Sequence, residues 1–383
     1  MIHHTLPVID QVNTSMKKHP RIKKLFFAAG IAFTVFFIFS CLTPFIAPAS
    51  CFFTTYAALL FPYSFFAYLL WLCFVLLYYR KYFAWFLVIL IPAWKNICTV
   101  FSFHIPHSFS YKKDSNQLRV LSWNIDNFLY ATYFGKDLTV KQDSMLHFIR
   151  QMDADILCFQ DYSEAAPEFA KGNSIYIKDS LGYPYAYFSM DAYNYGTYIF
   201  SRLPILDSGH IQYSGKINPE SLAYVDIAFQ KQKIRVYNTH LYSMYVHTDT
   251  LKPRDVGYQF FKQDSAFIFH STRLERLAFF DKLHTEQAKL IRKELQKTKT
   301  PYIFCADLNS VPSSYVYQYI KKGMTDAFLQ KGYGLGGTFH RFSLTLRIDV
   351  LLMSKGITAS QYYSPQLDLS DHYPIVTDIS LQK

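Results

Sequence analysis

The 383-residue chain has little charge for its length. Asp, Glu, Lys and Arg make up 17% of it, whereas an ordinary soluble enzyme carries about 25%. Hydrophobic residues reach 51% and aromatic residues 19%, and most of this excess lies before residue 104. The distribution excludes an ordinary soluble protein. It predicts an apolar N-terminal region followed by a globular domain long enough to bury a sizeable core.

Several motifs of common enzymes and metal sites are absent from the sequence. The six cysteines form no CxxC pair and no Cys/His spacing of a zinc site. There is no GxxxxGK[ST] phosphate-binding loop and no GxSxG motif, which disfavours nucleotide-triphosphate chemistry of that type and an α/β-hydrolase esterase. Cys158 and Cys305 lie in strand-like runs, where they are expected as buried free thiols or, less favoured, as a disulfide.

The formal net charge of +11 suggests an anionic partner, which could be a phosphate substrate, an anionic lipid or a nucleic acid. Part of this charge has a simpler origin, because basic residues flank the first apolar segment and normally set its orientation. These residues are Lys17, Lys18, Arg21, Lys23 and Lys24. The charge alone therefore gives nucleic acid no advantage.

Two uncharged apolar runs, residues 25–46 and 52–79, are long enough to cross a bilayer. A third run, residues 83–103, is interrupted by a proline, a lysine and an asparagine. We therefore expect about three transmembrane helices after a basic cytosolic segment over residues 1–24. A signal peptide is an alternative for the first run, but the apolar runs that follow favour an uncleaved anchor.

Basic residues also predict the orientation. The N-terminus and the Arg80-Lys81 pair both belong on the cytosolic side. Three spans then place the remainder of the chain outside the cytoplasm, and loss of the third span would reverse that placement.

The remainder consists of a polar linker, residues 104–117, and a domain over residues 118–383. Short β-rich runs interleave with helical periodicity in this domain, which predicts an α/β protein whose sheets contain antiparallel pairs. The β-rich runs are residues 119–125, 155–160, 195–200, 223–229, 234–240, 302–306, 348–353 and 375–381, and the helical ones are 140–152, 274–296 and 314–321. Residues 242–272 lack clear periodicity and could form a substrate rim, a membrane-touching loop or a packed insertion.

Polar residues stand at the ends of the apolar strands, where a sheet presents groups to a ligand. Each alone would be explained as a turn or cap residue, but six such places in one domain indicate a site. They are Asn124, Asp161, His240, the Asp307/Asn309 pair, Asp349 and the Asp371-His372 pair. Carboxylate and amide oxygens suit Mg²⁺ or Mn²⁺, and histidines beside carboxylates supply general acid–base groups.

Seven motifs carry a more specific signal, and they occur in one order along the chain. They are LSWN at 121–124, DILCFQD at 155–161, YIFSRLPI at 198–205, NTHL at 238–241, ADLN at 306–309, RID at 347–349 and SDHYPI at 370–375. The ordered set resembles the endonuclease/exonuclease/phosphatase superfamily, in particular its deoxyribonuclease/sphingomyelinase-like members. This resemblance implies a four-layer α/β/β/α sandwich with its site where the two central sheets open at one edge.

The resemblance also implies a divalent metal, Mg²⁺ or Mn²⁺. Asn124 and Asp161 would hold it, with Asp371 near it or completing the site. The family usually has Glu where Asp161 stands, so the shorter side chain could shift the metal or change its preference. Glu164 is an alternative ligand.

The catalytic roles follow from the same resemblance. His372 would be the general base that activates water, oriented by Asp349. Asp307 and Asn309 would position the nucleophile and bind the phosphoryl oxygens, and His240 would contact the phosphate and offset developing charge.

Together these features predict a membrane-anchored, metal-dependent phosphodiesterase or phosphatase of a bacterial type, in the inner membrane with its catalytic domain outside the cytoplasm. Its partners would be the lipid bilayer and a phosphoester substrate, for example a lipid headgroup. Water would attack the phosphorus of this substrate in line, and no obligate protein partner is evident. One alternative is a nuclease acting on extracytoplasmic DNA or RNA. Another is a binding module that uses the fold without turnover.

Overall fold

The computed structural model describes residues 20–126, 138–163, 174–191, 195–213, 220–244, 270–341, 343 and 345–382. Glu164, the alternative metal ligand, and most of the 242–272 stretch lie outside these residues.

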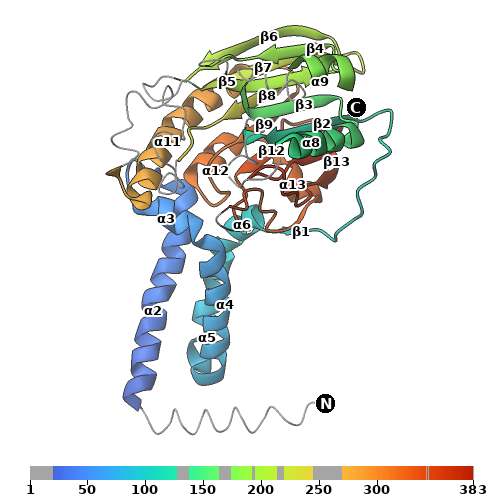
Figure 1. Ribbon diagram of the computed structural model, residues 1–383. Helices are drawn as coiled ribbons and strands as arrows, with labels where there is room; N and C mark the ends of the chain where they lie inside the picture. Colours follow the sequence, from blue (N-terminus) through green and yellow to red (C-terminus); the bar gives the residue numbers. More distant parts are fainter. Residues whose placement is uncertain are drawn as a thin grey trace.

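Two six-stranded sheets pack face to face in the domain (Figure 1). The first sheet has the order β13-β14-β2-β3-β5-β4, and the second has the order β10-β12-β9-β8-β7-β6. The first comprises β2 (Leu118–Asn124), β3 (Ile156–Ser163), β4 (Tyr185–Phe188), β5 (Tyr195–Ser201), β13 (Ile357–Tyr363) and β14 (Ile375–Leu381). The second comprises β6 (Ile205–Gln212), β7 (Ser221–Phe229), β8 (Gln232–His240), β9 (Tyr302–Asp307), β10 (Thr325–Asp326) and β12 (Asp349–Met353).

Helices cover the outer face of each sheet, so that the central strands are buried on both sides. Helices α8 (Leu138–Met152) and α9 (Ser174–Leu181) pack on the first sheet, and α11 (Arg273–Lys297) and α12 (Tyr315–Lys321) pack on the second. Every residue of β2, β9 and β12 is buried, as expected for strands covered on both faces. The predicted four-layer α/β/β/α sandwich is therefore confirmed.

Small aliphatic side chains fill the space between the sheets. Val120 and Ile199 of the first sheet meet Val236, Ile303 and Leu351 of the second in one buried cluster. The two cysteines of the strand-like runs lie in this same cluster as free thiols. The disulfide that the sequence left open is therefore absent.

A buried polar contact also joins the sheets near their functional edge. The side-chain amide of Asn238 on β8 donates to the carbonyl oxygens of Phe159 (2.9 Å) and Tyr198 (3.1 Å) in the opposite sheet. Gln160 in turn donates to the Asn238 side-chain oxygen at 2.7 Å. Buried amides with these partners fix how the two sheets sit relative to each other.

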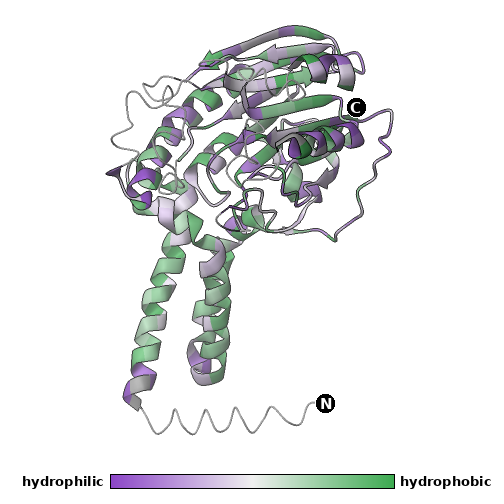
Figure 2. Ribbon diagram, in the orientation of Figure 1, coloured by the Kyte–Doolittle hydropathy of each residue, from purple (hydrophilic) through white to green (hydrophobic). Residues whose placement is uncertain are grey.

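The N-terminal region projects from the domain as a stalk of apolar helices (Figures 1 and 2). It contains α2 (Pro20–Leu42), the 3₁₀ turn η1 (Thr43–Phe45), α3 (Phe53–Leu59), α4 (Phe61–Tyr78), α5 (Arg80–Val88) and α6 (Leu90–Val100). Two helical stretches, Lys23–Phe45 and Phe61–Tyr78, are long and apolar enough to cross a membrane, and α5 with α6 is a third candidate bent by 53°. Tyr79 donates to the carbonyl of Lys23 at 2.9 Å, so α2 and α4 run antiparallel.

The second apolar run differs from its prediction as one helix. It breaks at Leu60, directly before the Phe61-Pro62 start of α4. Proline is favoured in the first turn of a helix and disfavoured within one, so the chain changes direction there. The short α3 that results lies against the domain, and its Thr55 and Ala58 are buried.

The last helix of the stalk is attached to the domain by a hydrogen bond from a buried arginine of the domain. Arg347 donates to Asp326 at 2.6 Å and to the carbonyl of Thr99 at the end of α6 at 2.9 Å. Strand β1 (Ser102–Phe103) then pairs with β11 (Tyr333–Gly334). The C-terminal end of the helical region is thus fixed to the domain.

Candidate active site

The ends of several strands bring the predicted residues together at one edge of the sandwich. Strands β8 and β9 are parallel with His240 opposite Asp307, and the antiparallel β12 places Asp349 opposite the same Asp307. In the other sheet, the parallel strands β2 and β3 end together with Asn124 opposite Gln160. Since the sheets face each other, these ends form one cluster.

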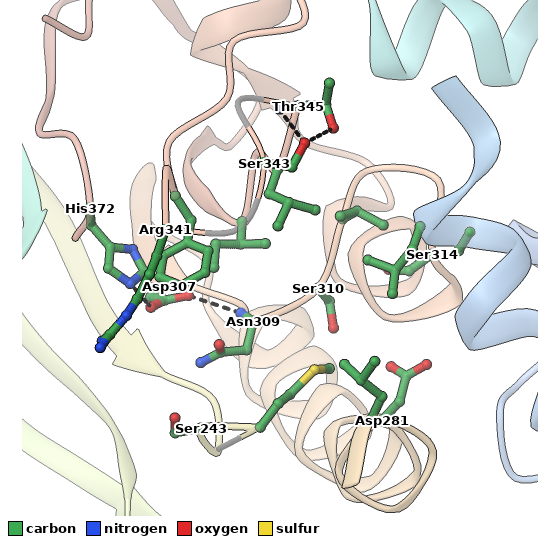
Figure 3. Close-up of a pocket in the computed structure, with 18 of the residues that line it drawn as sticks. Ser243, Asp281, Asp307, Asn309, Ser310, Ser314, Arg341, Ser343, Thr345 and His372 are labelled. Atoms are coloured by element: carbon green, nitrogen blue, oxygen red, sulfur yellow. Dashed lines mark hydrogen bonds and ion pairs between the residues drawn. The ribbon is translucent and has the colours of Figure 1, made fainter. Parts of the chain in front are cut away.

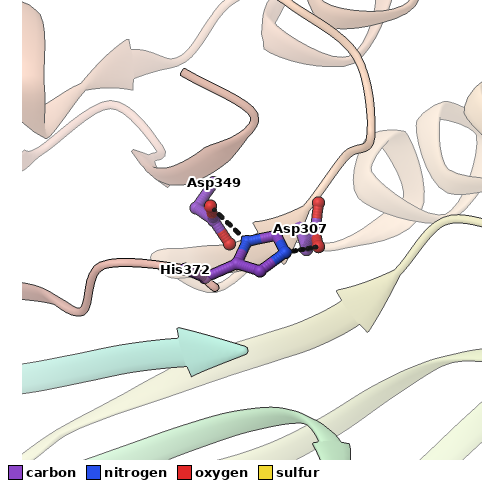
Figure 4. A group of neighbouring side chains, drawn as sticks. All are labelled: Asp307, Asp349 and His372. Atoms are coloured by element: carbon purple, nitrogen blue, oxygen red, sulfur yellow. Dashed lines mark hydrogen bonds and ion pairs between the residues drawn. The ribbon is translucent and has the colours of Figure 1, made fainter. Parts of the chain in front are cut away.

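His372 lies between two buried carboxylates (Figure 4). Its Nδ1 is 2.9 Å from the Asp349 carboxylate, and its Nε2 is 3.7 Å from that of Asp307. Burial alone would lower the pKa of His372, but the charges of Asp349 and Asp307 and the hydrogen bond to Asp349 raise it to about 10. Burial raises the pKa of Asp349, against the opposing effect of His372. This geometry fixes the ring with Nδ1 toward Asp349 and leaves Nε2 facing Asp307.

The loop that carries His372 is fastened to the end of β2. The Ser370 hydroxyl donates to the carbonyl of Asn124 at 2.8 Å and accepts from the His372 backbone at 3.2 Å. The Trp123 indole donates to the His372 carbonyl at 2.9 Å. The position of the histidine is thus set by its backbone as well as by Asp349.

His240 occupies the centre of a second acidic group. Its Nδ1 is 2.8 Å from Asp161 and 3.5 Å from Glu220, and its Nε2 is 3.5 Å from Asp307. The Asn309 amide lies 2.9 Å from the same Nε2. Burial opposes the charged ring, but Asp161 and Glu220 raise the pKa of His240 well above its usual value. The surrounding carboxylates thus favour the charged form of the His240 ring, which suits an anionic ligand.

Asp161 is held in an uncommon backbone conformation. Its φ is +50°, at a register shift of β3 between Phe159 and Tyr162. Burial would raise the pKa of Asp161, but His240 and hydrogen bonds from Tyr195 and Asn124 lower it to about 2. The carboxylate at the position usually occupied by Glu is thus ionised and fixed by three partners.

An aspartate that the sequence reasoning missed adds to this charge. Asp126 lines the same pocket as Asn124, Asp161 and Asp371. Burial, Asp371 and Asp161 raise the pKa of Asp126 well above its usual value. Carboxylate and amide oxygens are the ligands that hard divalent cations such as Mg²⁺ and Mn²⁺ prefer, so the donor chemistry suits the expected metal. The carboxylate oxygens of Asp126, Asp161 and Asp371 do not, however, lie within 4.8 Å of one another.

Another group in the described part of the chain meets the distance requirement for a metal ion. Ligand atoms of Asp307, Asp349 and His372 all lie within 4.8 Å of one another. The 2.9 Å hydrogen bond between Asp349 and His372 also suits this triad to proton transfer. The distances thus favour the triad for an ion, whereas the family resemblance points to the ligands beside Asn124.

Three further residues of the cluster were not expected from the sequence. Glu220 precedes β7 and reaches His240 only because β7 and β8 pair as neighbours, so no local signal marks it. Arg341 lies 3.6 Å from Asp371, and Tyr195 donates to Asp161 from the adjacent strand. Asp126 follows Asn124 by two positions, and this closeness to a predicted metal ligand is the sequence signal by which it could have been found.

The cluster opens into a cavity of about 380 Å³ (Figure 3). His372, Asp307 and Asn309 lie along one side of the close-up, and Asp281 and Ser314 lie toward the other. The sequence-predicted residues that line it are Asn124, Asp161, His240, Asp307, Asn309, Asp371 and His372. Asp349 stands behind His372 and does not appear in the lining. One pocket thus joins the candidate metal ligands and the histidines.

A sandwich of two sheets with paired carboxylates and histidines at its open edge defines a class of phosphoester hydrolases. The sequence profile of the endonuclease/exonuclease/phosphatase family matches residues 121–372. The chain belongs to this family, whose enzymes generally depend on divalent metal ions. Residues 23–100 match a family described only as a domain of unknown function.

Solved structures share the fold at low identity. An endonuclease/exonuclease/phosphatase from Bacteroides vulgatus is 17% identical, with a TM-score of 0.50 over 70% of this chain and 99% of that one. The human Nocturnin catalytic domain is 18% identical, with a TM-score of 0.49 over 70% of this chain and 94% of that one. The Bacteroides thetaiotaomicron mannosyl-6-phosphatase is 17% identical, with a TM-score of 0.48 over 69% of this chain and 100% of that one. No curated protein sequence matches the chain.

Proposed function

We propose that this protein is a membrane-anchored, divalent-metal-dependent phosphoester hydrolase whose substrate is a lipid headgroup or another phosphoester of the cell envelope. One observation carries the proposal: the cavity that contains the histidine and carboxylate cluster is also lined by residues of the N-terminal helical region. The cavity that holds the reacting groups therefore adjoins the ends of the candidate membrane spans, where a membrane substrate is concentrated.

The histidines have distinct tasks in hydrolysis. His372 Nε2 accepts the proton of the attacking water, while Asp349 holds the ring and stabilises the imidazolium. A new P–O bond forms to that water, and the bond to the leaving alcohol breaks. His240 and the Asn309 amide, which line the same cavity, would donate to the phosphoryl oxygens and offset the charge that develops.

The metal is assigned to Asn124, Asp161 and Asp371, with Asp126 adjacent. A divalent cation there would polarise the phosphoryl group and offset the carboxylates that raise the pKa of His372. Asp307 remains between both histidines and positions the water and the phosphate.

The orientation follows from the path of the chain. Helix α2 approaches the domain, α4 leaves it, and α5 with α6 returns to it (Figure 1). Three crossings would place the domain on the side opposite the basic N-terminus, outside the cytoplasm. A reporter fused after Lys113 should be active only outside the cytoplasm, and activity of a cytosol-only reporter would contradict this placement.

The function is tested with the full-length protein in detergent micelles. Substrates are p-nitrophenyl phosphate, bis(p-nitrophenyl) phosphate, vesicles of phosphatidylglycerol and phosphatidylethanolamine, and plasmid DNA, each with Mg²⁺, Mn²⁺ or EDTA. We expect release of phosphate or a phosphorylated headgroup from the vesicles, loss of activity in EDTA, and at least a 10²-fold loss in His372→Ala. His147→Ala, at an exposed position on α8, is the matched control. Nicking of plasmid without lipid turnover would replace the lipid substrate by nucleic acid.

A further inference from the structure

The catalytic cavity has an apolar side that hydrolysis of a small phosphoester would not use. Val311, Phe339, Leu346 and Ile348 of the domain line it, beyond the histidine and carboxylate cluster. The N-terminal region completes this side with Thr55, Ala58, Leu59, Leu60 and Tyr63. A polar cluster and a hydrocarbon surface within one cavity match a ligand that is polar at one end and apolar at the other.

Specific contacts hold the N-terminal part of this wall against the domain. The Ser313 hydroxyl donates to the carbonyl of Ala58, and the Thr43 hydroxyl donates to the carbonyl of Ser313, both at 2.7 Å. Thr55 donates to the buried Asp281 at 2.5 Å. Ala58 also packs with Val311, Phe339 and Ile348 in a small apolar cluster. Hydrogen bonds and apolar packing thus fix this wall in place against the domain.

The position of this wall relative to the candidate spans indicates where the ligand comes from. The first span ends at Phe45 and the second begins at Phe61, both on the domain side of the stalk. Leu60 directly precedes the second span and remains 47% exposed in the cavity wall. A hydrocarbon chain lying beside Leu60 would therefore be at the level where the spans emerge from the bilayer.

We infer that this wall, formed by Ala58, Leu59 and Leu60 together with Val311 and Leu346, binds the hydrocarbon chain of the substrate while its phosphate occupies the histidine cluster. The substrate class is a phosphoester with an alkyl or acyl chain close to the phosphate, drawn from the adjoining leaflet. The inference rests on the proposed hydrolase function and extends it, because it makes the N-terminal helices part of the substrate site as well as an anchor.

Chain length is the variable that tests it. The full-length protein in micelles is assayed with alkyl p-nitrophenyl phosphates and with alkyl phosphates whose chains are methyl, butyl, hexyl and octyl, below their critical micelle concentrations. We expect kcat/KM to rise with chain length, by at most about fourfold for each methylene group that leaves water. This series uses the unaltered protein, so it does not depend on whether a variant folds.

A substitution then locates the effect. Leu60→Gln should lower the ratio of octyl to methyl kcat/KM by about tenfold, since a glutamine side chain desolvates poorly beside an alkyl chain. Leu42→Gln is the matched control, because Leu42 is 45% exposed at the end of α2 and does not line the cavity. Turnover without chain-length dependence, or an unchanged ratio in Leu60→Gln, would overturn the inference and leave the hydrolase function standing. No turnover of any member with either metal would overturn both.

Discussion

Replacing Asp349 by asparagine tests whether His372 acts through a fixed tautomer. In the structure the Asp349 carboxylate accepts from Nδ1 at 2.9 Å, which keeps a proton on Nδ1 and makes Nε2 the atom that exchanges a proton with water. An asparagine amide can instead donate to Nδ1, and the ring proton then moves to Nε2, where it blocks the base. Removing the carboxylate also removes the first of the charges that raise the pKa of His372.

We expect Asp349→Asn to lower the catalytic rate strongly, although it replaces only one carboxylate oxygen by an amide nitrogen. The corresponding substitution in a Ser-His-Asp triad lowers kcat by about 10⁴-fold, or about 5.4 kcal/mol of transition-state stabilisation. Here Asp307 still faces Nε2 at 3.7 Å, and the backbone contacts of His372 remain, so we expect a fall of about 10² to 10⁴-fold. Stability should change little, because Asp349 is buried and burial already disfavours its charge.

The assay is kcat/KM for bis(p-nitrophenyl) phosphate across pH 5 to 10, together with thermal unfolding and Mn²⁺ binding by calorimetry. Asp179→Asn, the same chemical change at an exposed position on α9, is the control. An Asp349→Asn rate within tenfold of the unaltered protein would refute the tautomer argument. Loss of Mn²⁺ binding in this variant would instead place the metal in the Asp307, Asp349 and His372 triad.

Three further predictions concern stability. Burial raises the pKa of Asp281 to about 6 despite the hydrogen bond from Thr55. Folding therefore favours the protonated carboxyl, and the free energy of unfolding should fall by about 3 kcal/mol as the pH rises from 4 to 6. Asp281→Asn should remove that slope in thermal unfolding measured against pH, and an unchanged slope would contradict it. Mg²⁺ or Mn²⁺ at about 100 times its Kd should stabilise the fold by about 2.7 kcal/mol, and the absence of an EDTA-reversible thermal shift would argue against a metal site. Arg347→Met should lower the free energy of unfolding by about 3–5 kcal/mol, because it leaves Asp326 buried without its 2.6 Å partner. Arg150→Met, at an exposed position on α8, is the control. An equal loss in both variants would show that the buried ion pair contributes little.

Much of the sandwich could be predicted because its central strands are continuous apolar runs. The run predicted at 375–381 is β14 as found, and those at 234–240 and 302–306 differ from β8 and β9 by one or two residues. Strand β6 was missed, since its residues are largely exposed and carry only weak alternation. Its place beside β7 is fixed by backbone pairing, which leaves little trace in residue type.

In the candidate site, too, some residues have a local sequence signal and others are placed only by strand pairing. Asn124, His240 and Asp307 could be recognised because each ends an apolar strand, and ordered motifs tied them to one family. Glu220 reaches His240 through a strand pairing, and a single sequence contains no information on its distance from that ring.

The low charge and apolar N-terminal runs determined that this protein has candidate membrane spans, and the strand-end motifs indicated the family to which its domain belongs. Both are local properties: hydrophobicity accumulates along a run, and a motif is read from neighbours in the chain. Only the tertiary structure decided that Leu60 and His372 line the same cavity. That proximity arises because α3 packs on the domain through contacts between residues more than 200 positions apart, such as Ala58 with Ser313. The sequence thus distinguished the candidate spans from the hydrolase domain, and the packing placed residues of both in the wall of one cavity.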